Sequence, residues 1–238
     1  MDSRAGRVLE PGHRRMVDDD EWDWITEHAT GDFNHLIFAS TLPVLLPPAL
    51  HYMEAWDEAV AEGAWGKGVW ARLGEKLRQG LDLEHWAAFQ ESFHRVIGLA
   101  KEIATGKRGE PPGSVVFLSG DIHNAYLAEL AFPNGTDAKS PIWQGVCSPI
   151  RNPLGGHERM TMKLAGSKPI EVVARFLAHR AGVKDTDATW RLVTDQTFDN
   201  QVSTLDWEGK SAKLTLEKAV PGDPRHPRLE CSFEHRLA

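Results

Sequence analysis

Residues 114–126 read SVVFLSGDIHNAY, and this stretch decides how the chain is expected to fold. Residues 115–118 are apolar and rich in β-favouring side chains, so the segment begins as a buried strand. Gly120 then interrupts the run, and a carboxylate (Asp121) and an imidazole (His123) follow two positions apart. The stretch therefore predicts a strand that carries two polar side chains at its carboxyl end.

Two interpretations of this pair stay open when the residues are taken alone. Asp121 and His123 can form a hydrogen-bonded pair that closes a turn. They can also bind a metal, because the sheet anchors the strand and the glycine allows close backbone approach. A carboxylate with an imidazole suits iron, zinc or manganese. G-D-x-H is a short pattern, and the pattern by itself does not choose between the two interpretations.

Composition excludes several classes of protein. The chain has 238 residues, of which 41% are hydrophobic and 26% charged, as in a soluble globular protein that buries a sizeable core. A net charge of -7 without a basic stripe predicts no nucleic-acid patch. No apolar run reaches the roughly 18 residues of a membrane helix, and the N-terminus lacks the apolar core of a secretory signal. The two separated cysteines, Cys147 and Cys231, suit a reducing, cytoplasmic location.

The order of the predicted elements favours an α/β layered fold with a sheet, flanking helices and a β-rich C-terminal end. An acidic cap at residues 18–20 opens the first helix. Further helices are predicted over 51–63, 71–81, 82–106 and 169–182. Besides the opening strand, strands are predicted over 35–40, 125–132, 142–148, 188–196, 200–207 and 211–219.

Prolines and glycines divide these elements. Residues 41–50 (TLPVLLPPAL) contain three prolines and predict a rigid loop over the surface. Residues 149–156 predict another loop, and residues 208–210 a turn between two strands. Residues 221–238 are proline-rich and predict a loosely packed tail after a domain that spans residues 1–220.

Several stretches resemble one family, in its own motif order. LSGDIHNAY (118–126) resembles the final metal motif, SGD-x-H, of the alkaline phosphatase D-like (PhoD-like) branch of the calcineurin-like metallophosphoesterases. DSRAGR (2–7) resembles the D-T/S-R-x-x-R element of that branch, and DLEHWAAF (82–89) resembles its D-x-W-x-G-Y element. TFDNQVSTLDW (197–207) resembles its C-terminal strand pair. The resemblance therefore spans nearly the whole chain.

The resemblance implies a metal-dependent hydrolase of phosphomonoesters or phosphodiesters, with a small-molecule phosphoester as substrate. Its dinuclear centre would hold divalent or trivalent ions (Fe, Ca, Zn or Mn). Asp121 and His123 would be catalytic metal ligands. Arg4 would contact phosphate, although a solvent-exposed arginine is the alternative. Asn124 would either donate to phosphate or cap the turn.

The departures from the family pattern predict an incomplete site. The family's D-x-H, G-D-x-x-D and G-N-H-D/E blocks have no counterpart before Asp121. Residues 155–158 (GGHE) echo the last block but follow the closing motif, so we interpret them as coincidence. His85 departs from the family context and is interpreted as a surface or partly packed histidine.

The chain is thus expected to be the C-terminal half of such an enzyme, unable to assemble the full centre alone. The alternative is a non-catalytic remnant or interaction module. In both cases a half-domain leaves apolar faces and sheet edges for a partner chain or a homo-oligomer to cover.

Overall fold

The structure of the chain is a computed structural model with a mixed α/β fold. It describes residues 1–10, 12–66, 68, 69, 72, 74, 76, 84–133, 135–148, 159, 160, 167–222 and 226–238. The described helices are α1 (Asp19–His28), α2 (Pro48–Ala61), the 3-10 helix η1 (Trp86–Ala88), α4 (Gln90–Ala104) and α6 (Lys168–Arg180). The predicted helix over 71–81 falls mostly, and the predicted loop over 149–156 wholly, outside the described residues.

The strands form two sheets. β1 (Leu36–Ala39), β2 (Val115–Ser119) and β4 (Ile142–Cys147) are parallel neighbours, and β3 (Ala125–Ala131) and β5 (Thr189–Leu192) complete a mixed sheet in the order β1-β2-β4-β3-β5. β6 (Gln201–Glu208), β7 (Ser211–Val220) and β8 (Arg228–Arg236) form an antiparallel sheet in sequence order. The expected strand over 115–118 and the turn over 208–210 are both confirmed.

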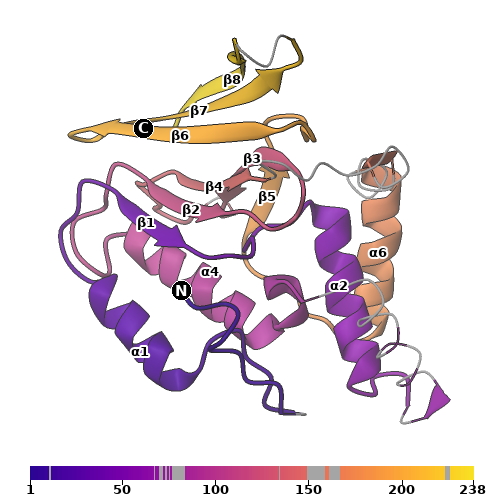
Figure 1. Cartoon of the computed structure of the whole chain (residues 1–238). Helices are drawn as coiled ribbons and strands as arrows, with labels where there is room; N and C mark the ends of the chain where they lie inside the picture. The colour runs from indigo at the N-terminus through magenta and orange to yellow at the C-terminus, as the bar shows by residue number, and fades with distance from the viewer. Residues whose placement is uncertain are drawn as a thin grey trace.

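The elements lie in layers. Figure 1 shows the three-stranded sheet on one face of the five-stranded sheet, α1 and α4 on the opposite face, and α2 beside α6 at one side. β2 shows why both faces are covered: Val115 and Phe117 belong to the core against the helices, whereas Val116 packs with Leu214 between the sheets. Alternate side chains of a strand point to opposite faces, so an apolar run such as β2 requires a covering layer on each side.

The proline-containing segment 41–50 differs from the rigid surface loop that was expected there. Residues Leu42, Val44, Leu45 and Leu46 are at most 2% exposed, and Pro48 begins α2 instead of extending a surface loop. Proline is tolerated in the first turn of a helix because its missing N–H has no partner there. Residues 42–47 are therefore a buried connection and not a surface loop.

Polar side chains from distant strands make this burial possible. Gln144 Oε1 accepts hydrogen bonds from the backbone N–H of Val44 (3.0 Å) and Leu45 (3.3 Å). Tyr126 Oη donates to the carbonyl of Leu45 (2.7 Å), and the Trp190 indole donates to the carbonyl of Leu46 (2.7 Å). A buried loop is stable only if such backbone groups find partners.

The expected helix over 82–106 is also corrected. Phe89, with φ -129° and ψ 67°, separates η1 from α4, and residues 82 and 83 lie outside the described part of the chain. The side chains of Glu84, His85 and Trp86 each bond a different segment, so tertiary contacts hold residues 84–88 out of the helix.

The described residues 226–238 of the tail are not loosely packed. β8 occupies residues 228–236 and pairs with β7, and Leu237 is 1% exposed in the core between the sheets. Alternation in this segment is interrupted by the bulge opposite Leu216 and Glu217, which hides the strand pattern in the sequence.

Candidate metal and phosphate site

The candidate site lies at the carboxyl edge of the parallel strands β1 and β2. The chain leaves β1 through Ser40 and Thr41, and it leaves β2 through Gly120 and Asp121. The N–H of Ser40 donates to the Leu118 carbonyl (3.0 Å), and the N–H of Gly120 donates to the Thr41 carbonyl (3.3 Å). The two exits are therefore fixed side by side, at the edge where open α/β sheets bind ligands.

Asp121 and His123 have unusual backbone geometry. Their φ angles are 62° and 55°, and they are the non-glycine residues of the described chain with positive φ. Left-handed backbone is unfavourable for residues with a Cβ, although Asp and His tolerate it better than most. Such geometry persists where the surrounding structure holds it, and it concentrates at functional sites.

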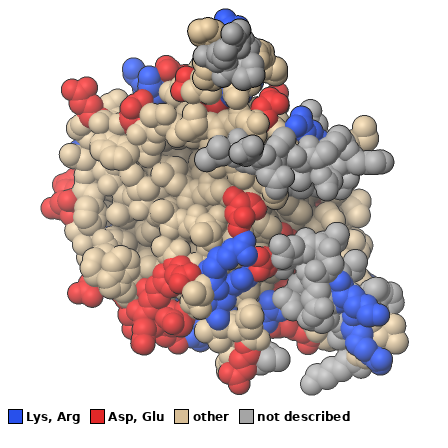
Figure 2. Space-filling view, viewed as in Figure 1, with Lys and Arg blue, Asp and Glu red and all other residues tan. Residues whose placement is uncertain are grey.

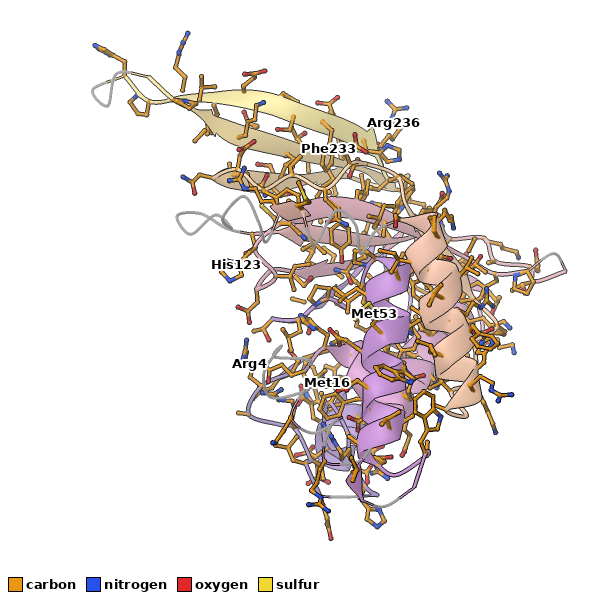
Figure 3. All side chains as sticks on the ribbon, turned by 90° about the vertical axis from the view of Figure 1, so that its right-hand side faces the viewer. Arg4, Met16, Met53, His123, Phe233 and Arg236 are labelled. Carbon is orange, nitrogen blue, oxygen red and sulfur yellow. The ribbon has the colours of Figure 1, made fainter. Side chains whose placement is uncertain are left out.

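Arg4 joins this edge from the N-terminus. Its Nη2 forms an ion pair with Asp121 Oδ2, and its Nη1 lies 2.8 Å from Glu84 Oε1. Arg7 Nη1 pairs with the other oxygen of the same carboxylate, Glu84 Oε2. Figure 3 shows Arg4 and His123 on the same side of the molecule, and in Figure 2 basic and acidic side chains meet near the centre of one face.

Hydrogen bonds hold the N-terminal segment in place. The Met1 ammonium donates to the Ala39 carbonyl (2.9 Å), and the hydroxyls of Ser3 and Thr41 lie 2.6 Å apart. Asp2 Oδ1 accepts from the N–H groups of Arg4 and Ala5, and these backbone hydrogen bonds lower the pKa of Asp2. The turn that presents Arg4 is thus tied to the end of β1.

Asn124 faces the interior. It is 0% exposed, its Nδ2 donates to Gln196 Oε1 (3.5 Å), and its backbone carbonyl accepts from the Ser148 N–H (3.1 Å). Gln196 in turn lines a cavity of about 680 Å³ beside the first turns of α2 and α6. Asn124 therefore joins three chain segments behind the site, and its contact with phosphate stays a prediction.

His85 and Glu84 come from the segment before η1. His85 is partly packed, as expected, and its Nδ1 lies 2.7 Å from Oε1 of the buried Glu54 on α2. Glu84 is the functional candidate that sequence reasoning missed. Its place inside the DLEHWAAF stretch that resembles a family element was the available signal.

The side chains of Asp121 and His123 carry atoms of the kinds that bind metal ions. A carboxylate oxygen and an imidazole nitrogen suit iron, zinc or manganese better than calcium, which prefers oxygen ligands. Within the described ranges, no group of three or more His, Cys, Asp or Glu side chains could hold a metal together. A catalytic centre generally needs at least three protein ligands, so Asp121 and His123 alone would not complete one. His157 and Glu158 lie outside the described residues.

Comparison with protein-family models, with curated proteins and with solved structures finds no match for this chain. Of the helices that the structure describes, none has the length and apolar character needed to cross a membrane.

Proposed function

We propose that this chain supplies part of a metal-dependent phosphoester hydrolase centre of the alkaline phosphatase D-like type. One observation carries the proposal: Asp121 and His123, both in left-handed backbone, follow the central parallel strand β2 at the sheet's carboxyl edge. Positive φ favours glycine, and residues with a Cβ that hold such geometry concentrate at functional sites.

Each residue of the site has a role in this proposal. Asp121 and His123 hold the metal from a strand end that the sheet keeps rigid. When bound, metal ions supply a nucleophilic water near neutral pH and neutralise phosphoryl oxygens. Arg4 binds the phosphoryl group, because a guanidinium donates two parallel hydrogen bonds to such an anion. In this proposal the remaining ligands lie outside the described residues or on a second chain.

Metal analysis of the purified chain tests this function. In equilibrium dialysis against Mn²⁺, Zn²⁺ or Fe²⁺, which detects the weak binding expected of a partial ligand set, we expect bound metal in the wild type and loss of it in Asp121→Asn and His123→Ala. His28→Ala is the matched control, since His28 is an exposed histidine on α1. Hydrolysis of an aryl phosphate and an aryl phosphodiester is measured on the same samples. Equal metal content in all four proteins contradicts the proposal.

A second candidate is an interaction module without catalysis. Three large apolar side chains on α6, Val172, Val173 and Phe176, are 58–66% exposed. Exposed apolar clusters of this kind mark protein interaction surfaces. The sedimentation behaviour of the wild type and of Phe176→Glu distinguishes the cases: an oligomer that the substitution dissociates, together with metal-free protein, favours the interaction module.

A further inference from the structure

The Arg4 guanidinium lies between two carboxylates at the candidate metal site. One nitrogen, Nη2, pairs with Asp121 Oδ2, and the other, Nη1, lies 2.8 Å from Glu84 Oε1. Arg7 provides a second cation for Glu84, whereas Asp121 forms its ion pair with Arg4. Two arginines thus balance two carboxylates, and Arg4 is the cation that neutralises the proposed metal ligand.

We propose that Arg4 occupies Asp121 in the metal-free protein and that metal binding displaces it, which frees the guanidinium for the phosphoryl group. This inference rests on the proposed metal site. The physical reason is competition: the oxygen that accepts from Arg4 is an oxygen that a metal would bind. A divalent cation beside Asp121 also repels the guanidinium directly.

The surroundings allow Arg4 to move without unfolding the segment that carries it. The side chains of Arg4 and Asp121 are 45% and 43% exposed, so their ion pair is a surface contact of small energy. The backbone of residues 2–5 is held independently, by Asp2 Oδ1 and by the hydroxyl contact of Ser3 with Thr41. Glu84 can keep one guanidinium nitrogen while the other turns away from Asp121.

Arg7 provides the matched control. It carries the same charge and lies at the same site, but its ion pair is with Glu84 and not with Asp121. Removal of either arginine lowers the positive potential around a bound cation. Only removal of Arg4 also frees the Asp121 oxygen, so the difference between the two variants isolates the competition.

The test measures Mn²⁺ affinity of the full chain by electron paramagnetic resonance and by calorimetry, for wild type, Arg4→Gln, Arg7→Gln and Asp121→Asn. Thermal melts of the same proteins confirm that each is folded. We expect Arg4→Gln to bind Mn²⁺ about three- to tenfold more tightly than wild type, a range set by an exposed ion pair and one removed charge. Arg7→Gln should change the affinity less than Arg4→Gln, and Asp121→Asn should abolish binding.

The outcomes separate this inference from the proposed function. Mn²⁺ binding that depends on Asp121 but is unchanged or weakened in Arg4→Gln overturns the competition and leaves the metal site intact. Equal tightening in Arg4→Gln and Arg7→Gln also overturns it, because a general charge effect then suffices. Binding by Arg4→Gln but not by the wild type supports it strongly. The absence of Mn²⁺ binding in every variant overturns both proposals.

Discussion

Substitution of Gln144 tests how much the hydrogen bonds of one buried amide contribute to the stability of the fold. Gln144 lies on β4, is 0% exposed, and uses both ends of its amide. Its Oε1 accepts from the N–H groups of Val44 and Leu45, and its Nε2 donates to Ser119 Oγ (3.1 Å) and the Phe117 carbonyl (3.2 Å). One side chain therefore fastens the buried segment after β1 to the end of β2.

The substitution Gln144→Met removes these hydrogen bonds while keeping a side chain of similar length. Two backbone N–H groups then stay buried without an acceptor. Each costs about 1–3 kcal/mol, and the thioether recovers part of this through apolar contacts. We expect the free energy of unfolding to fall by about 2–5 kcal/mol, a large share of the roughly 5–15 kcal/mol that stabilises a typical domain.

Urea denaturation followed by tryptophan fluorescence and circular dichroism measures this loss. Gln90→Met is the control, because the Gln90 amide donates a single hydrogen bond, to the Ala87 carbonyl, at a partly buried position. The control should lose less than about 1 kcal/mol. A loss of that small size in Gln144→Met would refute the reasoning, since the buried segment would not then depend on its distant acceptor.

Four further predictions follow from other parts of the structure. Leu214→Ala should lower the free energy of unfolding, measured by urea denaturation, by about 2–4 kcal/mol, because Leu214 is 3% exposed between the sheets. A loss under about 1 kcal/mol contradicts tight packing of the two sheets. Burial lowers the pKa of His51 from 6.5 to about 3, so the unfolded chain binds more protons between these values and stability falls as the pH falls through this window. His51→Phe should remove about 1.4 kcal/mol per pH unit of that dependence between pH 6 and 4, and an unchanged slope argues against a neutral buried imidazole. Burial would raise the pKa of Asp185, but hydrogen bonds from Arg175, His179 and Tyr52 outweigh it and lower the pKa from 3.8 to about 2. The stabilisation from the ionised Asp185 is therefore present above pH 3.8 and lost as the pH falls through 2. Asp185→Asn should lower the melting temperature at pH 7 but not at pH 2. His123→Gly should leave the free energy of unfolding unchanged or raise it by up to about 1 kcal/mol, since glycine accepts positive φ, while metal binding is lost; a large destabilisation would make His123 a structural residue.

The sequence by itself determined the local features. Asp18 caps α1, since its Oδ1 accepts from the Glu21 N–H (2.8 Å), and the acidic run had predicted a helix start there. The apolar run of β2 and the alternation of β7 predicted strands that the structure contains. These features depend on neighbouring residues and on side-chain periodicity, which are read from a short stretch of chain.

Only the tertiary structure decided which distant residues meet. The segment 42–46 is buried, and the acceptor of its N–H groups, Gln144, lies about a hundred residues further along the chain. Arg4 contacts Glu84 and Asp121, which lie 80 and 117 residues further along the chain. Local propensity and hydrophobic pattern carry no information about such partners, because their proximity follows from the path of the whole chain. SGDIH therefore predicted the two candidate ligands, and the fold decided that Arg4 holds one of them.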